Sequence, residues 1–119
     1  MTIITGQKVK KAEHLFAEYK NNIPIFQSVL DGNYEGSVYV DCEVEPTWAV
    51  LQIPICFHFV AGKMIEKEIL EDILFNRILS AQDEKQLIVF SPSDEWQPLL
   101  KSIFEPHKGF LAVYSNIVN

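Results

Sequence analysis

The sequence predicts an α+β fold: a single mixed β-sheet of about five strands, an N-terminal helical pair and two further helices. Apolar alternation between residues 37 and 61 predicts the sheet. The second half then reads strand, helix, strand, helix, strand, which favours parallel crossovers. Stripes of apolar residues at helical spacing predict the helices. The expected order is α-α-β-β-α-β-α-β, in a single domain covering residues 1–119.

The N-terminal segment predicts the helical pair. Residues 7–20 form the first helix, because apolar side chains recur at i, i+3, i+4 and i+7: Ala12, Leu15, Phe16 and Tyr19. Asn22 can cap a second short helix, with Pro24 in its first turn. Gly32 or Asn33 would end that helix in a left-handed turn.

Residues 36–62 predict a β-hairpin around which the other elements pack. Its first arm is expected from Ser37 to Glu43, and a turn leads into a long second arm from Thr47 to Gly62. Both faces of the second arm are largely apolar, which is typical of a strand inside a sheet that is covered on both sides. Pro54 cannot donate to a ladder, so a bulge or break is expected there.

Residues 63–81 predict the longest helix, and this helix is apolar on two sides. One side carries Ile65, Ile69, Leu70, Ile73 and Leu74. The opposite side carries Met64, Phe75 and Leu79, which are our candidate interface residues. Such a helix is buried on two sides, so either a later segment of the same chain covers the second side or another chain does.

The last part of the chain predicts two strands with a helix between them. Leu87 to Phe90 is a short apolar run of the kind found in central strands, and residues 110–118 form a final strand. Ser93 is the expected N-cap of the intervening helix. Pro98 delays its regular part to near Gln97.

Composition argues against several classes of function. The net charge is −6, and the only basic cluster (Lys8, Lys10 and Lys11) is best explained as a solvated helix face, which argues against nucleic-acid binding. No apolar run approaches the roughly 20 residues of a membrane span. The N-terminus lacks the long apolar segment of a signal peptide, and Cys42 and Cys56 are expected as unpaired small residues. We therefore expect a cytoplasmic protein.

Metal and nucleophilic chemistry have no recognisable motif. The sequence has no CxxC, HxxxH or GxSxG pattern, so no metal site is predicted. Its five glycines are isolated, which argues against a phosphate-binding turn. His58, on a buried strand, is either a general base or, more commonly for such a position, a core residue with one satisfied hydrogen bond.

Four segments carry a family resemblance: Gly36–Asp41 (GSVYVD), Pro46–Ala49 (PTWA), Phe57–Gly62 (FHFVAG) and the helix start Pro92–Trp96 (PSDEW). Together they resemble the N-terminal half of the GNAT-like acetyltransferase family that includes the zwittermicin-A-resistance type. The similarity covers roughly residues 22–118.

The departures from that family bear on function. In GNAT acetyltransferases the acyl-CoA pyrophosphate rests on a Gln/Arg-x-x-Gly-x-Gly/Ala turn at a helix N-terminus. In the resembling family this turn lies in a C-terminal half without a counterpart in these 119 residues. Glu45 stands where the family usually has Asn before the proline. The resemblance therefore implies a GNAT-like N-terminal module without the cofactor half, and we predict no cofactor.

Two functional hypotheses follow. The first is a non-catalytic GNAT-like module that binds a partner or a small ligand. It would self-associate through the second side of helix 63–81 or through an open sheet edge. The alternative is a divergent acyl-CoA-dependent N-acetyltransferase, or a subunit of one whose site another chain completes. Acetyl-CoA would be the cofactor only in that case, and the missing glycine turn makes the enzyme the less favoured hypothesis.

The candidate ligand pocket lies on the hairpin. Its residues are Tyr39, Asp41, Trp48 and His58, which could supply a few polar groups within mostly apolar walls. The alternative interpretation of the same four residues is sheet packing plus one exposed acid.

Overall fold

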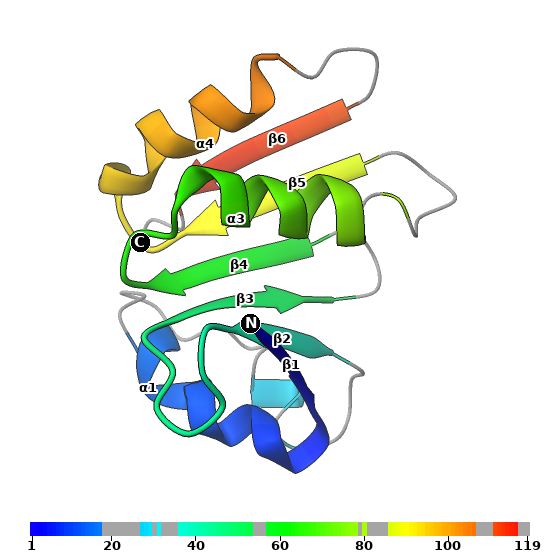
Figure 1. Ribbon diagram of the computed structural model, residues 1–119, viewed down its shortest axis with the longest axis vertical. Helices are drawn as coiled ribbons and strands as arrows, with labels where there is room; N and C mark the ends of the chain where they lie inside the picture. The colour runs from blue at the N-terminus through cyan, green and yellow to red at the C-terminus, as the bar shows by residue number, and fades with distance from the viewer. Residues whose placement is uncertain are drawn as a thin grey trace.

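The computed structural model describes residues 1–17, 27–29, 31, 36–53, 57–78, 80, 86–106 and 111–116, with the backbone alone for Gln86 and 111–116. A single six-stranded mixed sheet forms its centre, in the order β1-β2-β3-β4-β5-β6 (Figure 1). The predicted α+β fold with one mixed sheet and helices is confirmed. The expected order of elements contained four strands and the sheet has six, so the sequence pattern did not reveal two of them.

The first hidden strand is β1 (Thr2–Thr5), at one edge of the sheet. It pairs antiparallel with β2 (Ser37–Val40), with Ile3 opposite Tyr39. Four residues are too few for a clear alternation, so the sequence pattern did not reveal this strand.

The second hidden strand comes from the long hairpin arm, which is a correction to the prediction. The arm is two strands, β3 (Trp48–Gln52) and β4 (Phe57–Gly62), which pair antiparallel with Gln52 opposite His58. The backbone N–H of Ile53 donates to the Phe57 carbonyl at 3.0 Å, so the chain reverses between these residues. The break expected at Pro54 falls on 54–56, which lie outside the described residues.

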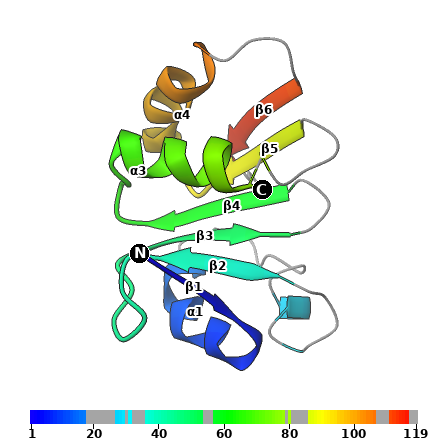
Figure 2. The ribbon, with the colours of Figure 1, turned by 45° about the vertical axis from the view of Figure 1, so that its right-hand side comes forward.

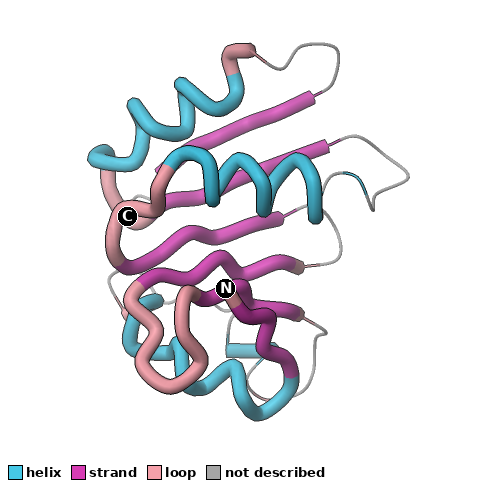
Figure 3. The backbone as a smooth tube through the Cα atoms, in the orientation of Figure 1, coloured by secondary structure: helices cyan, strands magenta, loops and turns pink. Residues whose placement is uncertain are grey.

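The second half of the sheet is parallel, as the order of elements predicted. β5 (Gln86–Ser91) pairs parallel with β4, and β6 (Leu111–Asn116) pairs parallel with β5. Figure 3 shows the two helical connections that link these strands.

The N-terminal helix is shorter and less regular than predicted. A 3₁₀ segment, η1 (Gly6–Ala12), leads into one α-helical turn, α1 (Glu13–Phe16). The predicted residues 18–20 and most of the second helix lie outside the described residues, and residues 27–29 are helical. The apolar stripe was nevertheless interpreted correctly where it is described, since Ala12, Leu15 and Phe16 are buried.

The helix predicted at 63–81 begins four residues later, as α3 (Lys67–Glu71), and continues as a π-helical segment, η2 (Asp72–Ile78). Sequence periodicity cannot separate these two forms over so short a span. After β5, a 3₁₀ turn η4 (Asp94–Trp96) precedes α4 (Gln97–Phe104). The prediction that the regular helix starts near Gln97 is confirmed.

Two apolar cores lie on opposite faces of the sheet. The ribbon in Figure 2 draws the helices that cover them. η1 and α1 cover the first face, whose core includes Ile4, Val9, Leu51 and Phe59. α3, η2 and α4 cover the second face, whose core includes Trp48, Val60, Leu74 and Trp96. Within the described residues, no helix has the length and apolar character needed to cross a membrane.

Candidate functional site

Asp41 organises the connection between β2 and β3. Its carboxylate accepts hydrogen bonds from the Thr47 backbone N–H at 2.8 Å, from the Thr47 hydroxyl at 2.5 Å and from the Trp48 N–H at 3.4 Å. Partial burial raises the pKa of Asp41, but these bonds and one from the Cys42 N–H outweigh it, so the net pKa is lowered. Asp41 therefore stays ionised and holds the loop closed at its base.

The same loop is tied to the first face of the sheet by ion pairs. Lys8 and Lys11 of η1 lie 3.4 Å and 3.9 Å from a carboxylate oxygen of Glu43. These pairs are exposed, so each contributes less than about 1 kcal/mol. They account for part of the basic cluster, which supports the prediction that it is a solvated face.

An open groove lies between helix α3 and the end of the sheet where β2 leads into the loop to β3. Its volume is about 410 Å³, within the range of small-molecule sites. The lining residues come from both sides: Met1, Asp41 and Trp48 from the sheet side, and Glu68, Ile69 and Asp72 from the helix side. Two of the four predicted pocket residues, Asp41 and Trp48, therefore share one groove.

Tyr39 belongs to the same region but is packed beneath it. It lies on β2 opposite Val50, and only 5% of its surface is exposed. Burial raises the pKa of its phenol, and the positive charge of Arg77 partly offsets that rise. The Tyr39 hydroxyl therefore stays protonated at neutral pH and does not line the groove.

His58 is separated from the other three candidates. It is completely buried on β4, between Gln52 of β3 and Val89 of β5. Its Nδ1 lies 3.3 Å from the carbonyl oxygen of Ile88, an acceptor, so Nδ1 carries the hydrogen of this contact. This environment fits the core interpretation of His58 better than the general-base interpretation.

Asp72 also lines the groove, although it was not among the four predicted pocket residues. Its carboxylate accepts from Asn76 Nδ2 at 2.9 Å and from Arg77 Nε at 3.0 Å. These hydrogen bonds lower the pKa of Asp72, and the bond from Asn76 has the largest effect. Residues five apart face one another across a π turn, which explains why Asp72 meets Arg77 here. The Asp-x-x-x-x-Arg spacing alone is too common to have revealed the site.

Of the three candidate interface residues, Met64 and Phe75 lie in different surroundings. The ring of Phe75 packs edge-on against Phe104 of α4, with centroids 5.7 Å apart. Met64 precedes α3 and is 46% exposed, and Leu79 lies outside the described residues. The second side of the helix is thus covered by α4 within the chain, at least around Phe75.

The junction between β4 and α3 is where a helix N-terminus meets the carboxyl end of a strand. Gly62 has φ +89°, and a Cβ there would lie 2.3 Å from the Thr47 carbonyl oxygen and 2.8 Å from Trp48 Cα. This glycine is needed for the close approach of β3. Glu66 is the N-cap of α3, without a side-chain capping bond, and Glu68 lies in the first turn.

A model of the GNAT acetyltransferase family matches residues 13–115. The chain belongs to the GNAT acetyltransferase family. The match starts in α1 and reaches into β6, so it covers nearly all of the described fold. No curated protein matches the chain. Within the GNAT family, the resemblance to the zwittermicin-A-resistance type stays a prediction.

The β4–α3 junction is a helix N-terminus, the kind of place where a diphosphate such as that of acetyl-CoA could bind. A diphosphate needs closely approaching backbone N–H groups and a positive environment. Gly62 is closed off by β3, and Glu66 and Glu68 offset the charges of Lys63 and Lys67. These residues do not fit a diphosphate, and no group of three metal-ligating side chains occurs in the described parts of the chain.

Proposed function

We propose that this GNAT-family chain is a binding module that acts by associating with another polypeptide chain and does not transfer acyl groups by itself. The observation that carries the proposal is the edge strand β1. Its outer edge has no partner strand among the described residues, and the segment Thr2–Thr5 contains no charge and no proline. Proteins usually place charged residues or prolines on an edge strand, because the free backbone groups of that edge can otherwise pair with another chain.

Apolar side chains are exposed at the same edge. Met1 and Ile3 are each 48% exposed, and they are two of the four large apolar residues that the described chain leaves exposed. A strand edge with exposed apolar residues favours pairing. The partner that needs no further component is a second copy, whose β1 would pair antiparallel across a twofold axis.

The lack of the GNAT glycine turn in this sequence supports a chain that does not transfer acyl groups by itself, and the β4–α3 junction offers no substitute for that turn. The one glycine there packs against Thr47, and two glutamates lie at the start of α3. A module of this kind would act by binding other molecules at its surface.

The cytoplasmic location predicted from the sequence is compatible with the exposed thiol of Cys42, since thiols stay reduced in the cytoplasm.

Family membership itself favours a second candidate function. The chain would then be a divergent acyl-CoA-dependent N-acetyltransferase, or a subunit of one, with a site completed by another chain. The described pairing of β4 with β5 begins with Phe57 opposite Ile88 and ends with Phe59 opposite Phe90. β4 itself continues beyond this pairing to Gly62. Carboxyl ends of parallel strands commonly bind ligands, so this is where an acyl-CoA site would be sought.

Light scattering tests the association. The chain should have twice its 13.7 kDa mass at a concentration of roughly 100 µM, as expected for a moderate dissociation constant. Ile3→Lys places a charge on the β1 edge and should yield a monomer with unchanged circular dichroism.

Met64→Lys is the matched control, because Met64 is apolar and 46% exposed but follows β4, which is an inner strand of the sheet. It should stay dimeric. A monomeric parent chain would overturn self-association, and dissociation by Met64→Lys alone would move the interface to the start of α3.

A further inference from the structure

The helical segment after α3 carries a charged residue where an α-helix would need an apolar one. Arg77 follows Ile73 by four residues and Leu74 by three. It also follows Leu70 by seven. These are the spacings at which residues of an α-helix share one face, and all three apolar residues are completely buried. A continued α-helix would therefore direct Arg77 toward the sheet.

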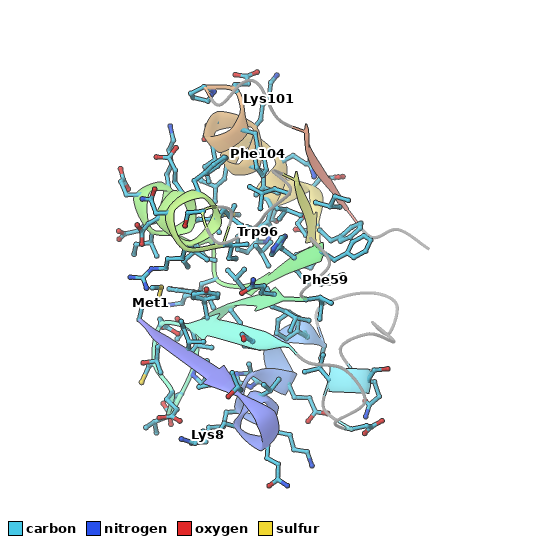
Figure 4. All side chains as sticks on the ribbon, turned by 90° about the vertical axis from the view of Figure 1, so that its right-hand side faces the viewer. Met1, Lys8, Phe59, Trp96, Lys101 and Phe104 are labelled. Atoms are coloured by element: carbon cyan, nitrogen blue, oxygen red, sulfur yellow. The ribbon has the colours of Figure 1, made fainter. Side chains whose placement is uncertain are left out.

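The place that Arg77 would then occupy is the second apolar core. The members of this core are apolar or aromatic side chains, and they come from the sheet, from η4 and from α4. In Figure 4, the labelled Trp96 and Phe104 belong to this core, on the side of the sheet that α3 and η2 cover. Burying a guanidinium there without a carboxylate would be strongly unfavourable, because the charge would lose its hydration without gaining a partner.

The π-helical form of η2 keeps Arg77 out of the core. Backbone hydrogen bonds of a π-helix join residues five apart, so such residues lie one above the other. Ile78 then follows Ile73 on the inner side, and Ile78 is completely buried. Arg77 follows Asp72 on the outer side, where its side chain is 46% exposed and its Nε lies 3.0 Å from the Asp72 carboxylate. The π form thus exchanges Arg77 for Ile78 at the core.

We propose that η2 is a two-form switch, in which the charge of Arg77 selects the π form over the α-helix and the ion pair with Asp72 locks it. The two forms differ at the groove, which Asp72 lines. In the π form Arg77 neutralises Asp72, whereas in an α-helix residues five apart do not face one another, and the groove would gain a free carboxylate. Phe75 would also turn relative to Phe104, so the switch would reach α4.

Scalar couplings across hydrogen bonds, measured by NMR on the isotope-labelled full chain, identify the carbonyl to which each backbone amide donates. The amide at position 77 should couple to the carbonyl of Asp72 in the parent chain, as a π-helix requires. In Arg77→Leu it should couple to the carbonyl of Ile73, as in an α-helix, because an apolar side chain can enter the core. Arg77→Lys is the matched control, since it keeps the charge and should keep the coupling to Asp72.

Amide hydrogen exchange tests the lock independently, so the proposal stays testable if Arg77→Leu does not fold. Asp72→Asn removes the ion pair but leaves Arg77 charged. The π-form couplings should therefore remain, while the amides of residues 76–78 should exchange about threefold faster. Glu105→Gln is the matched control, because it breaks the exposed Lys101–Glu105 pair of α4 and should leave exchange in η2 unchanged.

Four results would overturn the proposal. Coupling to Ile73 in the parent chain, or to Asp72 in Arg77→Leu, would show that the charge of Arg77 does not select the helical form. Loss of the coupling to Asp72 in Arg77→Lys would have the same meaning. Equal exchange rates in η2 for Asp72→Asn and Glu105→Gln would show that the ion pair is no lock.

Discussion

At the scale of single residues, Gly62 does what no other residue type could do at its position. Its φ of +89° is a region that side chains disfavour, and a Cβ would overlap backbone atoms of Thr47 and Trp48. The sequence marked Gly62 only as the end of a strand. Its close contact depends on where β3 passes, so only the folded chain reveals it.

Replacing this glycine gives a sharp test of the junction. Gly62→Ala should lower the free energy of unfolding by about 2–5 kcal/mol, because backbone strain and overlap with backbone atoms add. Gly6→Ala is the control: Gly6 has φ +62°, but nothing lies within 4 Å of its Cβ position. It should cost only about 1 kcal/mol. Urea denaturation measures both, and equal costs would contradict the close approach of Thr47 to Gly62.

Asp41 and Thr47 show how a predicted site residue can have a structural role. Asp41 was chosen as a polar group of a ligand pocket, and it does line a groove. Its carboxylate is also engaged by three donors from Thr47 and Trp48. It therefore shapes the groove as well as charging its rim. The sequence could indicate a loop acid here but not its partners, six and seven positions away.

At the scale of secondary-structure elements, the segment from Lys67 to Ile78 differs most from expectation. Its apolar residues indicated burial on two sides, and the choice between cover within the chain and cover by another chain was left open. The contact between Phe75 and Phe104 favours cover by α4. The π-helical form of η2 matches the Asp72–Arg77 pair, which a regular α-helix would not align.

A double-mutant cycle on the two rings tests this packing. Phe75→Leu and Phe104→Leu keep an apolar side chain and should each destabilise by about 1 kcal/mol. Their coupling should be about 0.5–1.5 kcal/mol, because the edge-on contact is lost with either ring. Phe59→Leu with Phe104→Leu is the control pair. Phe59 packs in the other core, so these two changes should add. A coupling of zero between Phe75 and Phe104 would contradict the packing of α4 on η2.

At the scale of the whole molecule, the chain has the sheet and crossovers of a GNAT protein, yet its β4–α3 junction does not fit a diphosphate. The two candidate functions differ in whether the chain binds acyl-CoA. Thermal unfolding with acetyl-CoA at about 1 mM distinguishes them. A ligand at about 100 times its dissociation constant adds roughly 2.7 kcal/mol, which would raise the melting temperature of a domain this size by several degrees.

We expect no shift with acetyl-CoA or free CoA. ADP at the same concentration is the control for non-specific diphosphate binding. A clear shift with acetyl-CoA and none with ADP would contradict the proposed function and make the acyltransferase the leading candidate.

The groove could be predicted only in part. Asp41 and Trp48 were both predicted as hairpin residues that could line a pocket, and both line the groove. Glu68, Ile69 and Asp72 come from a helix about 20 residues further along the chain, and their position depends on how α3 crosses the sheet. His58 was grouped with the pocket as a residue of the predicted second hairpin arm, but it lies on β4, and β3 separates β4 from the β2 strand of Tyr39.

The sequence by itself determined the fold class, the order of most elements and the faces of the strands. Periodicity is a local property of the sequence, so it can be recognised without knowing how distant segments of the chain pack. It could not show that the arm from 47 to 62 folds back on itself. In the folded sheet, odd-numbered residues pair with odd-numbered ones, as Ala49 with Ala61 and Leu51 with Phe59. The alternation of faces is therefore the same for one long strand and for two paired strands. Only the tertiary structure decided between them, because backbone pairing joins residues that the pattern along the chain does not connect.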